Sequence, residues 1–213
     1  YFYEVHTLSK SLSFQERVLK KAKGVIVITK HIKNILLEKG IERDKIFLAP
    51  DGVDLGYFKE INKNRDKFRR ENKLPLNKKV ILYAGHLYDW KGAHILAEVA
   101  KKTKEYLFVF IGGTEEDILS FKKKYGHLEN VEIRGHVVPK KVYQFIGKGA
   151  DVLILPNSGK YEISKFWTSP MKMFEYMASG NPIVASDIPS LREILNEENS
   201  ILVRPDSVDD LVQ

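Results

Sequence analysis

The stretch SPMKMFEYMASGNPIV, residues 169–184, predicts a helix that is followed at once by a strand. Ser169 is a good residue to cap the helix and Pro170 suits its first turn, so we expect a helix over 171–179 and a strand over 182–185. The start of this helix would present unpaired backbone N–H groups and the positive end of the helix dipole. Such a helix start suits an anion, and a diphosphate in particular.

Glu175 lies one turn inside this helix, with Phe174 and Met177 close to it in sequence. A lone carboxylate among such residues is costly unless a partner donates hydrogen bonds to it, and two ribose hydroxyls would do so. The helix start and Glu175 together indicate a nucleotide-sugar site. A surface glutamate on an amphipathic helix is the simpler alternative.

Short β-rich apolar runs alternate with helical patterns along the chain. This alternation predicts an α/β fold with a Rossmann-like parallel sheet and helices on both faces. The expected strands are 25–28, 46–49, 80–84, 106–111, 131–133, 152–155 and 182–185. The expected helices are 14–22, 31–39, 93–103, 115–125, 140–147, 171–179 and 190–196.

A segment rich in Lys, Arg and Asn separates two parts of the chain, and Pro75 breaks any helix before the strand that begins at Val80. We expect residues 1–55 to be the end of an N-terminal domain, 56–79 a linker, and 80–213 a nucleotide-sugar-binding domain. Because the chain opens without Met and stops inside a helical pattern, we expect it to be a piece of a longer protein.

Composition limits the classes of function. With 43% hydrophobic residues in 213, the chain can bury a core. It has no apolar stretch of about 20 residues and does not open with the pattern of a signal peptide, so we expect no part of it to span a membrane or direct export. The absence of cysteine excludes disulfides, thiol nucleophiles and thiolate metal sites, and fits a cytoplasmic location. The net charge of +7 favours acidic partners. Aromatic residues do not alternate with the basic runs, so we expect no nucleic-acid binding.

The first strand after the linker ends in YAGHLYDWKG, residues 83–92. In open parallel sheets this position lines the ligand crevice. Gly85 would let a ligand approach the backbone, and Lys91 and His86 would offset phosphate charge. A turn glycine and a surface lysine are the simpler interpretation. The stretch lacks both the G-x-G-x-x-G and the Walker A patterns, which argues against dehydrogenases and P-loop NTPases.

Two later turns follow strands in the same way. Gly112 and Gly113 precede Thr114, which we expect to cap a helix with an acidic first turn, so a structural role is favoured there. Residues 134–139, RGHVVP, would present backbone groups to a flat base.

These three turns and the Ser-Pro-Met-Lys helix, in this order and spacing, resemble the C-terminal donor-binding half of the retaining, two-Rossmann-domain (GT-B) glycosyltransferases of family four. The resemblance covers nearly the whole chain and is most specific over residues 174–185. Upstream, Thr29-Lys30, residues 49–54 and Phe58 look like the family's segments at the domain junction, although Asn is more usual there than Asp51.

The resemblance implies a role for each site residue. Donor binding would fall to Gly85, Val137, Ser169, Pro170, Met171, Lys172 and Glu175. Within this set, Glu175 would hold the ribose, the backbone of residues 169–171 the diphosphate, and Val137 the base. The catalytic residues would be Lys91 at the leaving phosphate, His6 near the transferred sugar, and His86.

The chain departs from the family pattern at two positions. Trp167 stands where a second glutamate usually contacts the donor sugar, although relatives with the Ser-Pro-x-Lys variant also lose it. His86 stands where an arginine is usual, so more of the diphosphate charge would fall to Lys91.

We therefore expect a retaining hexosyltransferase that uses a nucleoside diphosphate sugar and needs no cofactor or metal, since no Asp-x-Asp pair is present. A nucleotide-sugar epimerase of the same architecture and a non-catalytic binding module remain alternatives. The acceptor, a glycan or a lipid-linked sugar, is unknown. The basic, aromatic-bearing residues 14–23 would permit a peripheral membrane contact.

Overall fold

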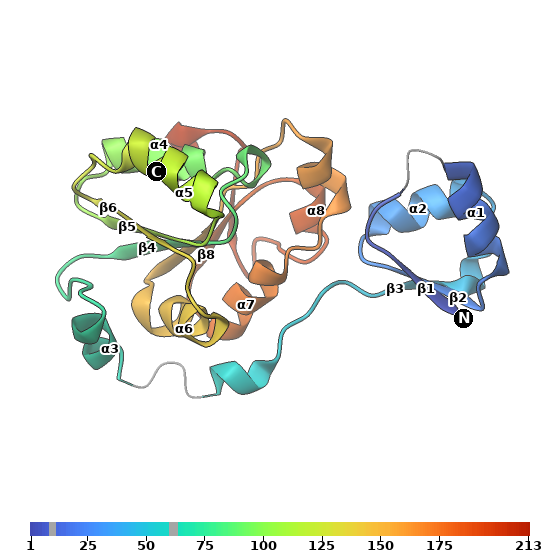
Figure 1. The fold of residues 1–213 in the computed structure, drawn as a ribbon, viewed down its shortest axis with the longest axis horizontal. Helices are drawn as coiled ribbons and strands as arrows, with labels where there is room; N and C mark the ends of the chain where they lie inside the picture. The colour runs from blue at the N-terminus through green and yellow to red at the C-terminus, as the bar shows by residue number, and fades with distance from the viewer. Residues whose placement is uncertain (9–11, 60–63) are drawn as a thin grey trace.

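The computed structural model describes residues 1–8, 12–59 and 64–213, and the strands in these residues form two sheets (Figure 1). The smaller sheet has the order β1-β2-β3 and the larger one β6-β5-β4-β7-β8-β9. Every neighbouring pair is parallel. The strands are β1 (Phe2–Val5), β2 (Gly24–Val27), β3 (Ile46–Leu48), β4 (Val80–Ala84), β5 (Leu107–Ile111), β6 (Val131–Gly135), β7 (Val152–Leu155), β8 (Ile183–Ser186) and β9 (Ile201–Val203).

The α-helices in the described residues are α1 (Leu12–Lys21), α2 (Lys30–Glu38), α3 (Arg65–Glu71), α4 (Ala93–Lys102), α5 (Glu115–Tyr125), α6 (Pro139–Gln144), α7 (Met171–Ser179), α8 (Pro189–Arg192) and α9 (Val208–Val212). The expected Thr114 cap of α5 is confirmed: its side chain accepts from the Asp117 N–H, and the Asp117 carboxylate accepts from the Thr114 N–H. No helix in the described residues is both long and apolar enough to cross a bilayer.

Alternate residues of the larger sheet face two separate apolar cores. Leu82 belongs to one core with Met173 of α7, whereas the next residue, Tyr83, belongs to the other with Leu96 of α4 and Phe121 of α5. Figure 1 accordingly shows α4 and α5 over one face of this sheet and α6 and α7 over the other. The predicted α/β fold, with a parallel sheet and helices on both faces, is confirmed.

The order of the larger sheet reverses at β4. The chain first moves outward from β4 to β5 and β6, and then crosses to β7 on the other side of β4. In doubly wound sheets with such a reversal, ligands bind beyond the carboxyl ends of the strands at the point where the order changes. We therefore expect the ligand site at the turns that follow β4, β5 and β6.

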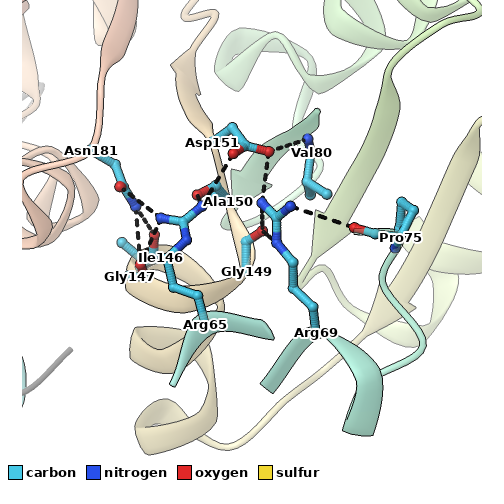
Figure 2. A network of polar contacts seen from close by, with 10 residues as sticks. All are labelled: Arg65, Arg69, Pro75, Val80, Ile146, Gly147, Gly149, Ala150, Asp151 and Asn181. Carbon is cyan, nitrogen blue, oxygen red and sulfur yellow. Dashed lines mark hydrogen bonds and ion pairs between the residues drawn. The ribbon is translucent and has the colours of Figure 1, made fainter. Parts of the chain in front are cut away.

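Helix α3 lies within the segment 56–79 that the sequence predicted as a linker, and no predicted helix corresponds to it. Two arginines on this helix reach the amino end of β7 (Figure 2). Arg69, which is 6% exposed, pairs with Asp151 at 2.6 Å, and Arg65 pairs with the same carboxylate at 3.2 Å. The helix is thereby attached to the larger sheet.

Asp151 also accepts a hydrogen bond from the Val80 N–H at 2.8 Å, at the start of β4. Burial alone would raise the pKa of Asp151, but the Val80 N–H, the hydrogen bond from Arg69 and the arginine charges together hold it below its ordinary value. Asp151 therefore joins α3, β4 and β7, at the end of the sheet opposite to the expected ligand crevice.

Hydrogen bonds join the smaller sheet's unit to the larger one. The Lys30 N–H, in the first turn of α2, donates to both carboxylate oxygens of Glu193 at 2.8 and 2.9 Å. The Asp51 N–H donates to Ser169 Oγ at 3.0 Å. The second bond ends just before α7, beside the expected crevice.

A second contact between the units involves aromatic rings. The His31 ring stacks on Phe166 with centroids 4.7 Å apart and meets the Trp167 ring edge-on at 5.0 Å. The Thr29 hydroxyl donates to the Phe166 C=O at 3.1 Å. Trp167 also packs against the core of the smaller unit.

Candidate functional site

A cleft of about 660 Å³ opens at the carboxyl ends of β4, β5 and β6, beside the first turn of α7. Its volume lies within the range typical of small-molecule sites. The sequence-predicted site residues that line it are Gly85, His86, Lys91, Val137, Ser169, Pro170, Met171, Lys172 and Glu175. Turns and a helix that are far apart in sequence thus meet at the switch point of the sheet.

His6 does not line this cleft. It is exposed at the end of β1 and lies 3.1 Å from the Glu4 carboxylate. Burial raises the pKa of Asp51, and the nearby His6 partly offsets that rise. His6 therefore stands on the side of the molecule where Asp51 contacts Ser169, and its catalytic role stays a prediction.

The cleft also contains residues that the sequence did not single out. Trp90 and His136 lie in the turns 83–92 and 134–139, which the sequence had already indicated as parts of the site. Tyr143 lies on α6, and no motif marks it. Gly112 and Gly113, expected to be structural, line the wall as well.

Glycines hold the three turns against one another. Gly85, with φ of +146°, donates its N–H to the Ile111 C=O at 2.8 Å. Gly112, with φ of +110°, donates to the Gly135 C=O at 2.7 Å. A Cβ on Gly112 would lie 2.5 Å from the Gly85 C=O, so a side chain there would push the turns apart. Glycine is required here for the packing of the cleft floor.

The first turn of α7 differs in one detail from expectation. We expected Ser169 to cap the helix, but Pro170 is the residue before the helix and the Ser169 hydroxyl accepts from Asp51 instead. The first hydrogen bond of this turn runs from the Met173 N–H to the Pro170 C=O at 2.8 Å. The N–H groups of Met171 and Lys172 precede it, at the cleft wall, where an anion would be favoured.

Lys172 is the most unusual group in the cleft. Its side chain is 7% exposed, and its Nζ has no hydrogen-bond partner among the described residues. The ammonium position lies 4.2 Å from the centre of the Tyr83 ring. Burial first, and then the charge of Lys91, hold the pKa of Lys172 well below its ordinary range, while Glu175 offsets part of this shift.

Glu175 and Lys91 share this environment to a smaller degree. Burial raises the pKa of Glu175, and the charge of Lys172 counteracts the rise. Burial lowers the pKa of Lys91, whose Nζ lies 4.8 Å from the centre of the Trp90 ring. All three side chains therefore lie in one poorly solvated pocket, which is the setting in which charged ligand groups are held most strongly.

The two departures from the family pattern have different surroundings. His86 is exposed at the cleft and stacks on Tyr88 with centroids 4.9 Å apart. Trp167 does not line the cleft, because its ring lies in the contact between the two units. Glu175 is the one acidic residue among those that line the described cleft.

The family model for the group 1 glycosyl transferases matches residues 78–213, which is the larger sheet with its helices. The chain belongs to this family. The resemblance expected from the sequence is thereby confirmed for the donor-binding half.

Individual relatives of the chain are also glycosyltransferases by name. The chain is 25% identical over 180 residues to a processive diacylglycerol alpha-glucosyltransferase of Acholeplasma laidlawii, covering 84% of this chain and 52% of the relative. It is 26% identical over 204 residues to an uncharacterized glycosyltransferase of Methanocaldococcus jannaschii, covering 91% and 48%. The chain thus spans about half the length of these relatives.

Among solved structures, HepE of Anabaena in complex with UDP and glucose superimposes with a TM-score of 0.75 at 18% identity, covering 99% of this chain and 59% of that one. HepE is also known in complex with UDP-glucose. At this identity the likeness establishes the fold of both units and leaves the chemistry to be argued from the cleft.

Proposed function

We propose that this chain forms the donor-binding part of a retaining glycosyltransferase that moves a hexosyl group from a nucleoside diphosphate sugar to an acceptor. The observation that carries the proposal is the meeting of Lys91, Lys172 and Glu175 with the first turn of α7 in one poorly solvated cleft at the switch point. One buried amine, one half-buried amine and free helix N–H groups suit a diphosphate. The UDP in the HepE structures makes uracil the first base to test.

In this proposal the diphosphate lies against the N–H groups of Met171 and Lys172, with the two lysine side chains beside it. The difficult event is the departure of the nucleoside diphosphate, which concentrates negative charge on the phosphate oxygen that leaves the sugar. Fixed positive groups at that place lower the barrier because they are already oriented before the bond breaks. Lys91 and Lys172 are the groups that would do this.

Glu175 would accept hydrogen bonds from the two ribose hydroxyls. Its burial favours this role, since a carboxylate in that environment gains more from donated hydrogen bonds than one in water. Val137 and Tyr143, across the cleft on the β6–α6 side, are available to flank the base. His6 would approach the transferred sugar from the other unit.

The test is a thermal-shift screen of UDP, GDP, ADP and their sugars, because a ligand that binds only the folded chain raises its melting temperature. Glu175→Ala should remove most of the shift, and its loss of affinity should be about 1–3 kcal/mol, the scale of hydrogen bonds to a charged group. Glu105→Ala is the matched control, since Glu105 is exposed and precedes β5 at the opposite end of the sheet. Equal shifts in all three proteins would remove Glu175 from the site.

Two other functions predict different products. An epimerase would convert the sugar nucleotide in the absence of an acceptor, which product analysis in acceptor-free buffer detects. A non-catalytic module would bind the nucleotide and leave it intact, and the position of Trp167 outside the cleft makes this alternative worth testing. The relative that acts on diacylglycerol supports a lipid acceptor as the first to try, whereas a membrane contact and a cytoplasmic location stay predictions.

A further inference from the structure

The Lys172 amine occupies a place in the fold where a charge is hard to sustain. It is almost fully buried in the cleft wall, and no atom of the described residues accepts a hydrogen bond from its Nζ. A Cβ added to Gly85 would lie 3.5 Å from this nitrogen, so the backbone of the β4 turn approaches it closely. A charged amine in such a position costs several kcal/mol unless a partner compensates it.

Two tyrosine hydroxyls near the amine make hydrogen bonds with other groups. The Tyr83 hydroxyl donates to the His86 C=O, and the Tyr176 hydroxyl accepts from the Ala84 N–H at 2.9 Å. Only the face of the Tyr83 ring is turned to Lys172. A ring face attracts a cation by less than burial costs it.

Charged and titratable groups of the packed elements surround the amine. Tyr83 of β4, Lys91 of the turn after it and Glu175 of α7 act on it directly. His86 of the turn after β4, His136 of the turn after β6 and Tyr143 of α6 line the same cleft, and Tyr176 of α7 is hydrogen-bonded to Ala84. Lys91 disfavours a second positive charge, and Glu175 is the acid among them that favours it. Because Glu175 is itself disfavoured as an anion by burial, it compensates Lys172 only in part.

We propose that Lys172 is uncharged in the empty cleft and takes up a proton from solvent when a nucleoside diphosphate binds. The inference rests on the proposed donor site. The proton comes from the buffer, the amine nitrogen accepts it, and no bond in the ligand is made or broken. The diphosphate supplies the oxygen acceptors and the negative charge that the empty cleft lacks, which stabilises the ammonium form.

This linkage has a consequence for affinity. Where the free amine is neutral and the bound amine is charged, each pH unit upward should weaken UDP binding by about tenfold. A permanently charged arginine at the same place would show no such dependence.

The experiment is calorimetric titration of UDP at about pH 8, where a terminal phosphate with a pKa near 6 is fully ionised and cannot itself release a proton. The titration is run in two buffers of different ionisation enthalpy, Tris and HEPES, so that a difference in heat measures protons exchanged. The chain should take up as much as one proton per UDP. Lys172→Arg should bind UDP with equal heats in both buffers, and Lys172→Met should bind more weakly with equal heats.

Each other outcome contradicts a distinct statement. Equal heats for the unaltered chain, with UDP bound, would overturn the proton uptake and leave the donor site standing. Uptake that persists in Lys172→Arg would assign the proton to another group and overturn the role of Lys172. If the arginine variant does not fold, the pH dependence of UDP affinity in the unaltered chain decides: constant affinity above neutral pH overturns the proposal. No binding of UDP, GDP or ADP would reject the donor site itself.

Discussion

At the scale of single residues, the cleft is built from groups whose charges the fold disfavours. The pKa values of Lys172 and Lys91 are lowered and that of Glu175 is raised, with burial as the largest cause. Each shift favours the neutral form of the group. An apolar replacement would serve the empty chain better, since burying ionisable groups costs stability. Such a cost at a ligand site is expected where the groups act on a bound charge.

Lys172→Met should therefore stabilise the empty chain. Because the unfolded state binds a proton at this lysine and the folded state resists it, the unaltered chain gains stability as pH rises from the lowered folded pKa to the unfolded value near 10.4. The variant should be more stable at neutral pH by on the order of 1–3 kcal/mol, and the difference should shrink toward pH 10. Urea unfolding at several pH values measures this, with exposed Lys123→Met as control. A variant less stable at neutral pH would contradict the assignment.

Lys91→Ala addresses catalysis and needs a form of the protein that transfers sugar. The charge that Lys91 would neutralise grows as the sugar–phosphate bond breaks, so the variant should lose more in kcat than in UDP affinity. Steady-state rates and UDP titrations on the same samples separate the two. A loss confined to KM would make Lys91 a binding residue only.

At the scale of elements, the central strands and the edge strands β3 and β6 were predicted, whereas the edge strands β1 and β9 were not. Strands β4, β5 and β7 are continuous apolar runs because both faces are covered, and such runs are visible in sequence. The edge strands β1 and β9 are not fully buried runs, and each has a strongly exposed apolar residue, Phe2 and Ile201, so their sequences do not show the pattern of a strand covered on both faces.

Helix α3, with the sequence RDKFRRE, also escaped prediction, because it is held by arginine contacts to a distant aspartate and not by an apolar stripe. A distant contact also explains why the predicted cap role of Ser169 was wrong. The local sequence favoured a helix cap, but in the fold the Ser169 hydroxyl accepts a hydrogen bond from the distant Asp51 N–H. Most of the cleft was predictable because its residues either follow strands or begin helix α7, whereas the place of Tyr143 depends on how α6 packs.

Asp151→Ala tests how α3 is held. Removing the carboxylate leaves Arg69 buried without its ion pair and the Val80 N–H without its acceptor, so the free energy of unfolding should fall by about 3 kcal/mol at neutral pH. Because the folded pKa of Asp151 is lowered, its contribution is present above the unfolded pKa near 3.9 and is lost as pH falls through the folded value. The free energy of unfolding of the variant should therefore fall less on acidification than that of the unaltered chain.

Chemical unfolding at pH 7 and in acid measures both effects. Glu71→Ala is the control on α3 itself, because Glu71 is exposed and its 3.9 Å pair with Lys67 should contribute little. Equal losses in the two variants would mean that the network of Figure 2 does not hold the helix.

At the scale of the whole molecule, hydrogen bonds join the described part of the smaller unit to the larger one. The carboxylate of Glu193 accepts hydrogen bonds from the Lys30 N–H in the first turn of α2, where a negative charge is favoured by the helix dipole. This contact therefore stabilises α2 and joins it to the larger unit at the same time.

Glu193→Ala should loosen the smaller unit selectively, by about 1–2 kcal/mol, the scale of a charge-assisted hydrogen bond at a helix start. Hydrogen exchange resolves the effect: amides of β2 should exchange faster, while those of β5 in the larger sheet should keep their rates. Glu197→Ala is the matched control, since the Glu197 carboxylate is exposed and pairs with exposed Arg192 on the same segment. Faster exchange in both sheets would show that the two units unfold as one body. Unchanged exchange in β2 would show that the other contacts between the units, which are the stacking of His31 on Phe166 and the hydrogen bonds of Thr29 and Asp51, are enough to hold them together.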